Sequence, residues 1–330
     1  MWNVLQLVPA FVLAYLSDRT NRKNVLIFSQ LIGLVGGIVL YIFGSTPWVL
    51  ILIAITFNPT HVARAALLDI FPHYSTLKLV AITFFALNLP WMFFKEFSAF
   101  DFNFLVILTF VLLAVNSLLT FLFFHDRQKC GYSKVQFAKS IELLRNDRRI
   151  FYTLSAFICS EITFYLISIY IEYSKGTEVW LDITTFATLI GILIAMLYNR
   201  LPHMSMVTLF YSMGFGLIVV AILSSFLSIS SLQISLLSSM SHYAVIGGMY
   251  LPFVTDAVIK MLGNRNKGIG SALIEGGDAI AILIAMIFST AFVLSALWIF
   301  GIILVLFLLA TGIQKKAEKI RLEIVFHEHK

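Results

Sequence analysis

The sequence predicts an all-α polytopic membrane protein, and three observations support this fold class. Hydrophobic residues make up 60% of the chain and charged residues only 12%, whereas soluble domains carry about 25% charged residues. The apolar residues gather in long runs, and about 20 of them in a helix cross a hydrocarbon layer about 30 Å thick. Short polar breaks separate the runs. A soluble core could not absorb this apolar excess, so we expect the lipid bilayer to be a main partner.

The apolar runs predict about 11 transmembrane helices. In chain order they cover residues 1–17, 25–44, 48–70, 78–94, 103–124, 151–173, 180–198, 205–226, 232–261, 269–292 and 294–313. The break at 125–150 is longer and basic, and its apolar residues recur at helical spacing among charges. This pattern predicts an amphipathic helix on the membrane surface.

The long break divides the chain into four predicted parts. They are an N-terminal bundle of five helices (1–124), a cytoplasmic linker (125–150), a C-terminal bundle of six helices (151–313) and a charged cytoplasmic tail (314–330).

Lysine and arginine placement predicts the sidedness of the chain. If the loop at 18–24 faces the cytoplasm, 20 of the 23 basic residues fall on that side, because cytoplasmic loops carry an excess of Lys and Arg. Lys95 and Lys175 fall opposite, and Arg64 lies inside a helix. The net charge of +6 is thus explained by topology, and we expect no nucleic-acid partner. We expect a monomer in a bacterial inner (plasma) membrane, with the basic loops and C-terminus in the cytoplasm.

Residues 14–23 read Ala-Tyr-Leu-Ser-Asp-Arg-Thr-Asn-Arg-Lys. This loop resembles the G-x-L-a-D-R-x-G-R-K signature between helices 2 and 3 of the major facilitator superfamily. Asp18, Arg19, Arg22 and Lys23 match it. The resemblance implies a two-bundle transporter fold in which the 11 predicted helices are helices 2–12 of twelve. A first helix would then be missing, either because the start codon is misplaced or because the gene is truncated.

The same resemblance implies a cytoplasmic latch. In the family the motif aspartate lies near the start of helix 11, where free N–H groups and a partial positive charge attract a carboxylate. The motif arginines pair with an acid at the end of helix 4. The implied latch residues are Asp18, Arg19, Arg22, Lys23 and Asp69, with Arg200 and Asp256 as the counterpart in the second half. The alternative is that these charges are solvated loop residues that serve topology only.

A polar stripe on the predicted helix 48–70 indicates a substrate surface. Asn58, His61 and Arg64 follow one another at steps of three, so they share one helix face. An ionisable group inside a membrane costs about 2.5–3.5 kcal/mol on insertion scales, and such a face should turn to protein or water. We interpret Arg64 as the partner of an anionic group. Alternatively, Arg64 snorkels to the interface or pairs with Asp69.

Four further residues are candidates for proton coupling. Glu161 lies in the middle of the run 151–173, where burial favours its neutral form and allows it to carry a proton. Glu275 and Asp278 share a helix face and flank two glycines, and two acids so close do not both ionise readily. His242 is a potential relay member. The alternatives are a structural hydrogen bond at Glu161, and close packing at the glycines with the acids in a wet vestibule.

These features favour a secondary active transporter of a small solute that works by alternating access and is coupled to H⁺. We expect no cofactor and no metal. No Walker A, H-E-x-x-H or G-x-S-x-G motif occurs, so we do not expect an enzyme. One alternative is a truncated, non-transporting remnant or scaffold. Another is a transporter of lipid-type or siderophore-type amphiphiles.

Overall fold

The structure is a computed structural model that describes residues 2–44, 46, 49, 60–89, 100–124, 147–175, 177–197, 243–263, 266–291 and 296–328. Every element of regular secondary structure in these ranges is a helix. The helices are α1 (Trp2–Arg19), α2 (Arg22–Phe43), α4 (Thr60–Ile70), α5 (Thr76–Asn88), α7 (Phe102–Phe123), α9 (Arg148–Lys175), α10 (Thr177–Leu197), the π-helix η3 (Tyr243–Tyr250), α13 (Leu251–Leu262), α14 (Lys267–Ala291) and α15 (Ala296–Glu328).

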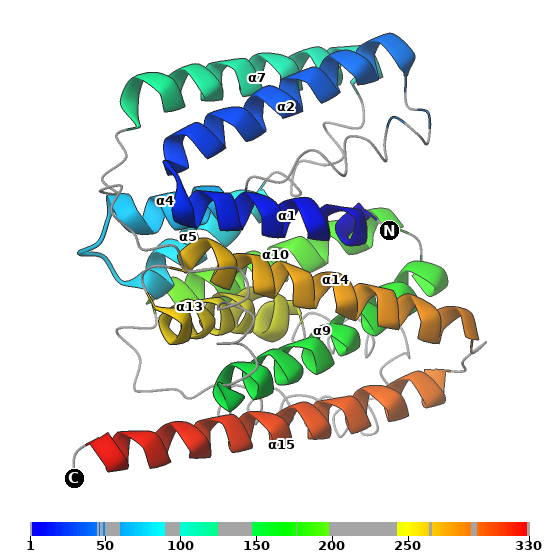
Figure 1. The fold of residues 1–330 in the computed structure, drawn as a ribbon. Coiled ribbons are helices and arrows are strands. Elements are labelled where there is room, and N and C mark those ends of the chain that lie inside the picture. Colours follow the sequence, from blue (N-terminus) through cyan, green and yellow to red (C-terminus); the bar gives the residue numbers. More distant parts are fainter. Residues whose placement is uncertain are drawn as a thin grey trace. The chain divides into compact units, whose positions relative to one another are not determined.

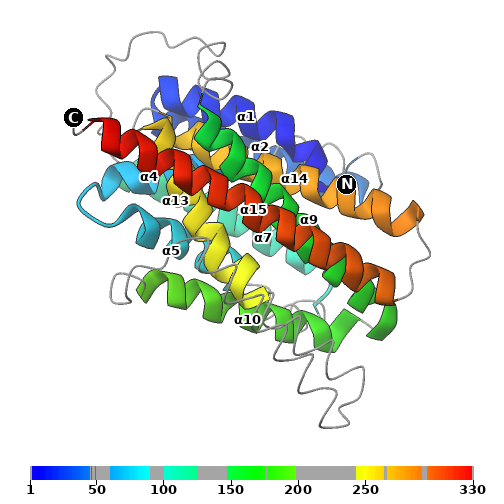
Figure 2. The ribbon, with the colours of Figure 1, turned by 90° about the horizontal axis from the view of Figure 1, so that it is seen from below.

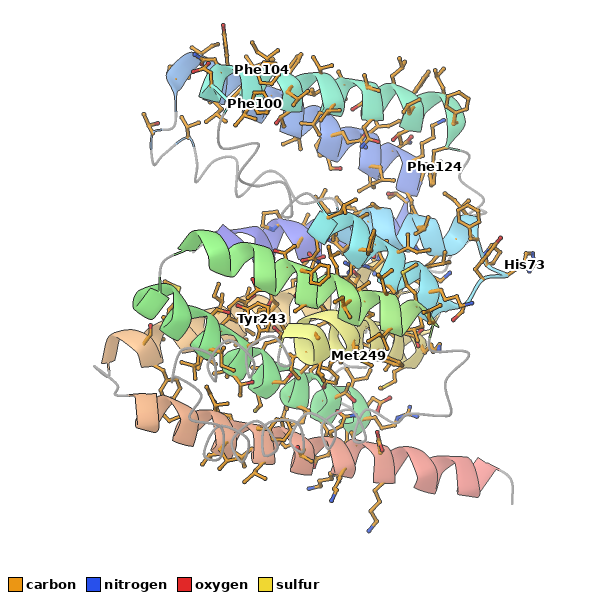
Figure 3. All side chains as sticks on the ribbon, turned by 180° about the vertical axis from the view of Figure 1, so that it is seen from behind. His73, Phe100, Phe104, Phe124, Tyr243 and Met249 are labelled. Carbon is orange, nitrogen blue, oxygen red and sulfur yellow. The ribbon has the colours of Figure 1, made fainter. Side chains whose placement is uncertain are left out.

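Several helices are membrane-spanning by length and composition. Within the described ranges, five stretches are long and apolar enough to cross a bilayer: Arg22–Phe43, Asn103–Phe123, Arg148–Ile169, Tyr243–Leu262 and Lys267–Ser289. On α7 only 6% of the apolar window is buried inside the protein. Phe100 and Phe104 stand at its N-terminal end with ring centroids 5.1 Å apart (Figure 3). The chain is an integral multi-pass membrane protein, and its predicted all-α class is confirmed.

The chain divides into two compact units whose segments alternate along the sequence. The first comprises Met1–Leu79, Phe93–Glu142 and Ile259–Ala279. The second comprises Val80–Met92, Leu143–Val258 and Ile280–Lys330. The four parts predicted from the sequence remain predictions, because the basic linker lies almost wholly outside the described residues.

In the first unit, α2 lies side by side with α7 (Figure 1). Local signals set where α2 starts and stops. The Asn21 side chain accepts the N–H of Asn24 at 3.2 Å and so caps the helix. Gly44 ends it with a φ of 70°, a conformation that glycine adopts most readily. Apolar residues of α1, α2 and α4 form the adjacent core: Leu13, Val25, Leu26, Val62 and Ala66.

In the second unit, α9 and α15 run side by side (Figures 1 and 2). The helix α10 packs against η3, which carries Tyr243 and Met249 (Figure 3). Their backbones approach closely at glycines: a Cβ added to Gly191 would lie 1.9 Å from the Ala244 carbonyl oxygen. Only glycine, which has no Cβ, allows the two backbones to approach this closely.

Two helix features differ from the sequence expectations. The last helix continues to Glu328, past the predicted end at 313, because Lys, Glu and Arg are themselves good helix formers. The π-helix η3 was not expected, since an apolar run carries no signal for the wider helix.

Candidate functional site

Asp18, at the end of α1, holds the first turn of α14. Its two carboxylate oxygens accept the backbone N–H groups of Gly268 at 3.0 Å and of Ile269 at 2.9 Å. These N–H groups have no partner within their own helix, and the helix dipole adds a partial positive charge there. The contact is close because residue 268 is a glycine, whose added Cβ would lie 2.8 Å from Ser17 Oγ.

Arg22 connects Asp18 to Asp69. Its Nη1 lies 2.9 Å from Asp18 Oδ1, and its Nε donates to Asp69 Oδ2 at 2.6 Å. The Arg22 side chain is fully buried. A buried guanidinium is tolerated when it is paired and hydrogen-bonded, and here it has a carboxylate on each side.

Lys267 extends this network and was missed by sequence reasoning. Its Nζ donates to Asp69 Oδ1 at 2.7 Å. Asp18, Arg22, Asp69 and Lys267 therefore alternate in charge, and we call them the Asp18 network. A signal was present: Lys267 lies two residues before the predicted helix 269–292, at the end that the motif aspartate was expected to contact.

Burial has an electrostatic consequence for Asp18. Desolvation raises the pKa of this carboxyl above its ordinary value, although Arg22 and the N–H groups of Ile269 and Gly268 act to lower it. The charged form of Asp18 therefore depends on all of these donors remaining in place.

The two other basic residues of the motif lie elsewhere. Arg19 is exposed and stacks over the Tyr15 ring at 3.9 Å, so Arg22 rather than Arg19 contacts Asp69. Lys23 donates to the Phe121 carbonyl oxygen at 2.7 Å, which links α2 to the end of α7.

A second group of polar residues joins α4 to α14, one to two turns deeper along each helix. His61 and Arg64 lie on one face of α4, and Ser271 and Glu275 lie one turn apart on α14. His61 Nδ1 is 3.3 Å from Glu275 Oε2, and Arg64 Nη1 is 3.8 Å from Glu275 Oε1. Arg64 also donates to Ser271 Oγ. We call these four residues the Arg64 cluster.

The members of the Arg64 cluster differ in exposure. The side chains of His61 and Arg64 are 0% and 1% exposed, whereas that of Glu275 is 23% exposed. Within the part of the chain that the structure describes, His61 Nε2 has no hydrogen-bond partner. The sequence placed His61 and Arg64 in one set and Glu275 in another, and the structure brings the two sets together.

The remaining candidates are more dispersed. Asp278 is partly buried one turn beyond Glu275 on α14, and Glu161 and Asp256 are buried on α9 and α13 in the second unit. Three candidates lie outside the described residues: Asn58, Arg200 and His242. No group of three or more His, Cys, Asp or Glu side chains that could hold a metal ion occurs among the residues whose positions are described.

Comparison with known proteins identifies the fold. No family model matches the chain, and no curated protein matches it by sequence. Among solved structures, the human organic anion transporter MFSD10 (TETRAN) matches with a TM-score of 0.70 at 16% identity, over 95% of this chain and 82% of that one. A bacterial homologue of the iron transporter ferroportin, in an outward-facing state, matches with a TM-score of 0.66 at 14% identity, over 96% and 88%.

The same bacterial protein with soaked iron matches with a TM-score of 0.63 at 13% identity. At these identities the likeness bears on the fold. It extends over nearly the whole chain, and it agrees with the resemblance of the loop at Asp18–Lys23. The chain therefore has the same all-α fold as these solved transporters.

Proposed function

We propose that the chain is a secondary active transporter that moves a small solute across the membrane by alternating access, driven by a proton gradient. The fold supports a transporter. The observation that carries the proposal is the Arg64 cluster, because an arginine, a histidine and a glutamate are gathered within apolar helices. Ionisable groups in such positions are costly and mark solute or proton pathways.

The Asp18 network supports a latch in this proposal. Its carboxylates come from α1 and α4, which the sequence assigns to the N-terminal bundle, and they hold the N-terminus of α14, which it assigns to the C-terminal bundle. Three charge-assisted contacts reach this terminus: those of Asp18 with the N–H groups of Gly268 and Ile269, and that of Asp69 with Lys267. Breaking them would free the terminus, and re-forming them would restore the closed arrangement. On the Lys and Arg bias, we place this latch at the cytoplasmic side.

Within the Arg64 cluster we assign the roles by charge. Arg64 and His61 face the solute, and Glu275 carries the proton, since it is an acid in direct reach of both. Asp278, Glu161, and the sequence candidates Asn58 and His242 remain secondary members of this proposal.

Reconstitution provides the direct test. Solutes are first screened by thermal shift on the purified protein, and hits are then measured for uptake into proteoliposomes with an imposed pH gradient. We expect uptake that follows the gradient and collapses with a protonophore. Uptake that ignores the gradient, and is unchanged in both Glu275→Gln and Glu161→Gln, would contradict proton coupling.

The proposed orientation is tested separately. We propose a bacterial inner membrane with both the loop at Asp18–Lys23 and the C-terminal tail in the cytoplasm. A fluorescent protein that matures only in the cytoplasm, fused after Lys330, should fluoresce. A fusion of alkaline phosphatase, which is active only outside, should remain inactive at the same position. The opposite pattern would overturn the assigned sidedness.

A further inference from the structure

Among its described residues, the first unit contains two arginine–carboxylate arrangements whose distances differ. Arg22 contacts its two carboxylates at 2.6 and 2.9 Å, which are lengths typical of charge-assisted hydrogen bonds. Arg64 Nη1 is 3.8 Å from Glu275 Oε1, which is an ion pair without such a bond. A carboxylate that met Arg64 with bidentate geometry would therefore be a better partner than Glu275.

The side chains of the Arg64 cluster differ in their exposure to solvent. Arg64 and His61 are enclosed, whereas Glu275 retains 23% exposure. Solvent thus reaches the acid and does not reach the guanidinium. The buried ring of His61 also presents an Nε2 for which the described residues supply no partner. Buried polar atoms are normally satisfied, so this atom points to a polar occupant.

We propose that the Arg64 cluster is the binding site for a monovalent carboxylate, which replaces Glu275 as the partner of Arg64 while Glu275 takes up one proton. The proposal rests on the proposed transport function and names its substrate class and its coupling. One proton from the medium forms one O–H bond on a Glu275 oxygen, and no other bond is made or broken.

Charge balance makes the proton obligatory. Arg64 and ionised Glu275 form a neutral pair. An incoming carboxylate would leave one uncompensated negative charge beside the fully buried side chains of Arg64 and His61, which is strongly unfavourable. Protonation of Glu275 removes that charge. Binding of the anion and of the proton are therefore mutually dependent, as linkage requires.

His61 narrows the substrate class further. A Glu275 oxygen can accept a hydrogen bond whether Glu275 is ionised or protonated. In the tautomer in which the neutral His61 ring donates this hydrogen bond from Nδ1–H, the lone pair of the ring lies on Nε2. That nitrogen then accepts a hydrogen bond. A carboxylate with a hydroxyl group beside it satisfies both Arg64 and His61, and this favours hydroxycarboxylates over plain carboxylates.

The titratable groups around Glu275 come from two helices. His61 and Arg64 face it from α4, and Asp278 lies one turn further along α14. Asp18 and Lys267 lie near the start of α14, where Asp18 pairs with Arg22 and Lys267 pairs with Asp69 in the Asp18 network. Among the described residues of α4 and α14, Asp278 is a further acid that could share the proton, and its variant is included in the test.

The test measures binding and proton uptake on the purified full-length protein in detergent, without transport. The probe is glycolate, a small hydroxycarboxylate, and acetate is the matched probe without the hydroxyl group. Binding is followed by the melting temperature of the protein in each probe solution, compared with its melting temperature in a chloride solution of equal ionic strength. Proton uptake is followed with a pH indicator in weakly buffered solution. We expect about one proton per glycolate, and an apparent Kd that rises about tenfold for each pH unit over the range in which glycolate binding takes up that proton.

Variants assign the effect to residues. Glu275→Gln should bind glycolate with no proton uptake and no dependence on pH, and Arg64→Gln should not bind it. In His61→Phe the preference for glycolate over acetate should vanish. Glu323→Gln, in the charged C-terminal segment, is the matched control and should behave like the wild type. If Asp278→Asn rather than Glu275→Gln abolished proton uptake, the assignment to Glu275 would be wrong.

Two results would overturn the whole proposal: glycolate binding by Arg64→Gln equal to wild type, or no glycolate binding by Glu275→Gln at any pH. Because the assay involves no membrane crossing, these results are independent of transport. A protein that binds glycolate with proton uptake but moves no solute in proteoliposomes would contradict the proposed function and leave the site intact.

Discussion

At the scale of single residues, Asp69 is the branch point of the Asp18 network. It accepts hydrogen bonds from Arg22 at 2.6 Å and from Lys267 at 2.7 Å, and its side chain is mostly buried. Asp69→Asn removes the charge that both cations share and leaves Arg22 more weakly paired. We expect a loss of about 1–3 kcal/mol, seen as a lower melting temperature of the detergent-solubilised protein.

Two other variants separate this effect from a general loss of charge. Lys267→Met removes only one of the two contacts and should cost less than Asp69→Asn. Lys260→Gln removes an exposed basic residue of α13 and should have little effect. A similar loss for Lys260→Gln and Asp69→Asn would contradict the central position of Asp69.

At the scale of helices, the crossing of α10 and η3 depends on two glycines. A Cβ on Gly191 would lie 1.9 Å from the Ala244 carbonyl oxygen, and a Cβ on Gly248 would lie 2.4 Å from the Thr188 carbonyl oxygen. These neighbours are backbone atoms, so neither helix can relieve the clash by rotating a side chain. Gly191→Ala should force the helices apart and cost about 1–3 kcal/mol or more, measured as the shift in melting temperature.

The matched substitution for this test is Gly312→Ala on α15. A Cβ added at Gly312 would meet nothing within 4 Å. Alanine is the better helix former by about 0.5–1 kcal/mol, so Gly312→Ala should be neutral or stabilising. Equal destabilisation by both variants would show that the effect belongs to helix propensity in general and not to the crossing.

The start of α9 predicts a dependence on pH. Asp147 Oδ1 accepts the N–H of Arg149 at 2.9 Å and so caps the helix, and Asp147 Oδ2 accepts from the Arg149 guanidinium at 2.7 Å. Desolvation acts to raise the pKa of Asp147, but the hydrogen bonds and charge of Arg149 outweigh it and hold the pKa below its ordinary value. A lowered pKa in the folded state means that ionised Asp147 stabilises the fold above its unfolded pKa, and that this contribution is lost as the pH falls through the folded value.

The measurement compares Asp147→Asn with the wild type across pH. Asparagine keeps an oxygen that can cap the helix, so the substitution removes mainly the charge. We expect the wild type to melt higher at pH 6, by an amount that corresponds to at most about 1 kcal/mol. The difference should shrink as the pH falls below about 4, the ordinary range of an aspartate, and should vanish below the lowered pKa of folded Asp147. A difference that persisted at low pH would show that the charge of Asp147 is not the cause.

The helices themselves were largely predictable, because an apolar run needs only composition to be recognised. The run 25–44 became α2 (Arg22–Phe43) and the run 103–124 became α7 (Phe102–Phe123). The end of α15 was not predictable in this way, since hydropathy marks where the bilayer ends and not where the helix ends. The Asp18–Lys23 loop was recognisable because a motif concentrates its residues within a short segment.

The pairing of helices was the harder part of the candidate site. His61 and Glu275 are 214 residues apart in the chain. Periodicity shows that His61 and Arg64 share a face, but it carries no information on which helix that face meets. Lys267 was missed for the same reason, since its role depends on Asp69 on another helix. The structure shows which residues are partners. It also shows that Arg64 on α4 lies near an acid, Glu275 on α14, which the sequence of neither helix shows alone.

At the scale of the whole molecule, the charge balance of the Arg64 cluster predicts how transport responds to voltage. If a monovalent carboxylate enters the Arg64 cluster with one proton on Glu275, the loaded site carries the same net charge as the empty one. A full transport cycle then moves no net charge, and a membrane potential does no work on it, whereas one uncompensated charge would feel about 2.3 kcal/mol per 100 mV. We therefore expect uptake that depends on the pH gradient and not on potential.

Proteoliposomes separate these two driving forces. Potassium gradients with valinomycin set the potential at equal pH, and buffer jumps set the pH gradient at zero potential. Uptake of a carboxylate identified by the binding assay should follow the pH gradient and remain constant when the sign of the potential is reversed. In Glu275→Gln the proton no longer accompanies the anion, so the same carboxylate should lose its response to the pH gradient, and any residual movement should become sensitive to potential. A wild type whose uptake reverses with potential would require net charge movement, and it would exclude one-to-one coupling through Glu275.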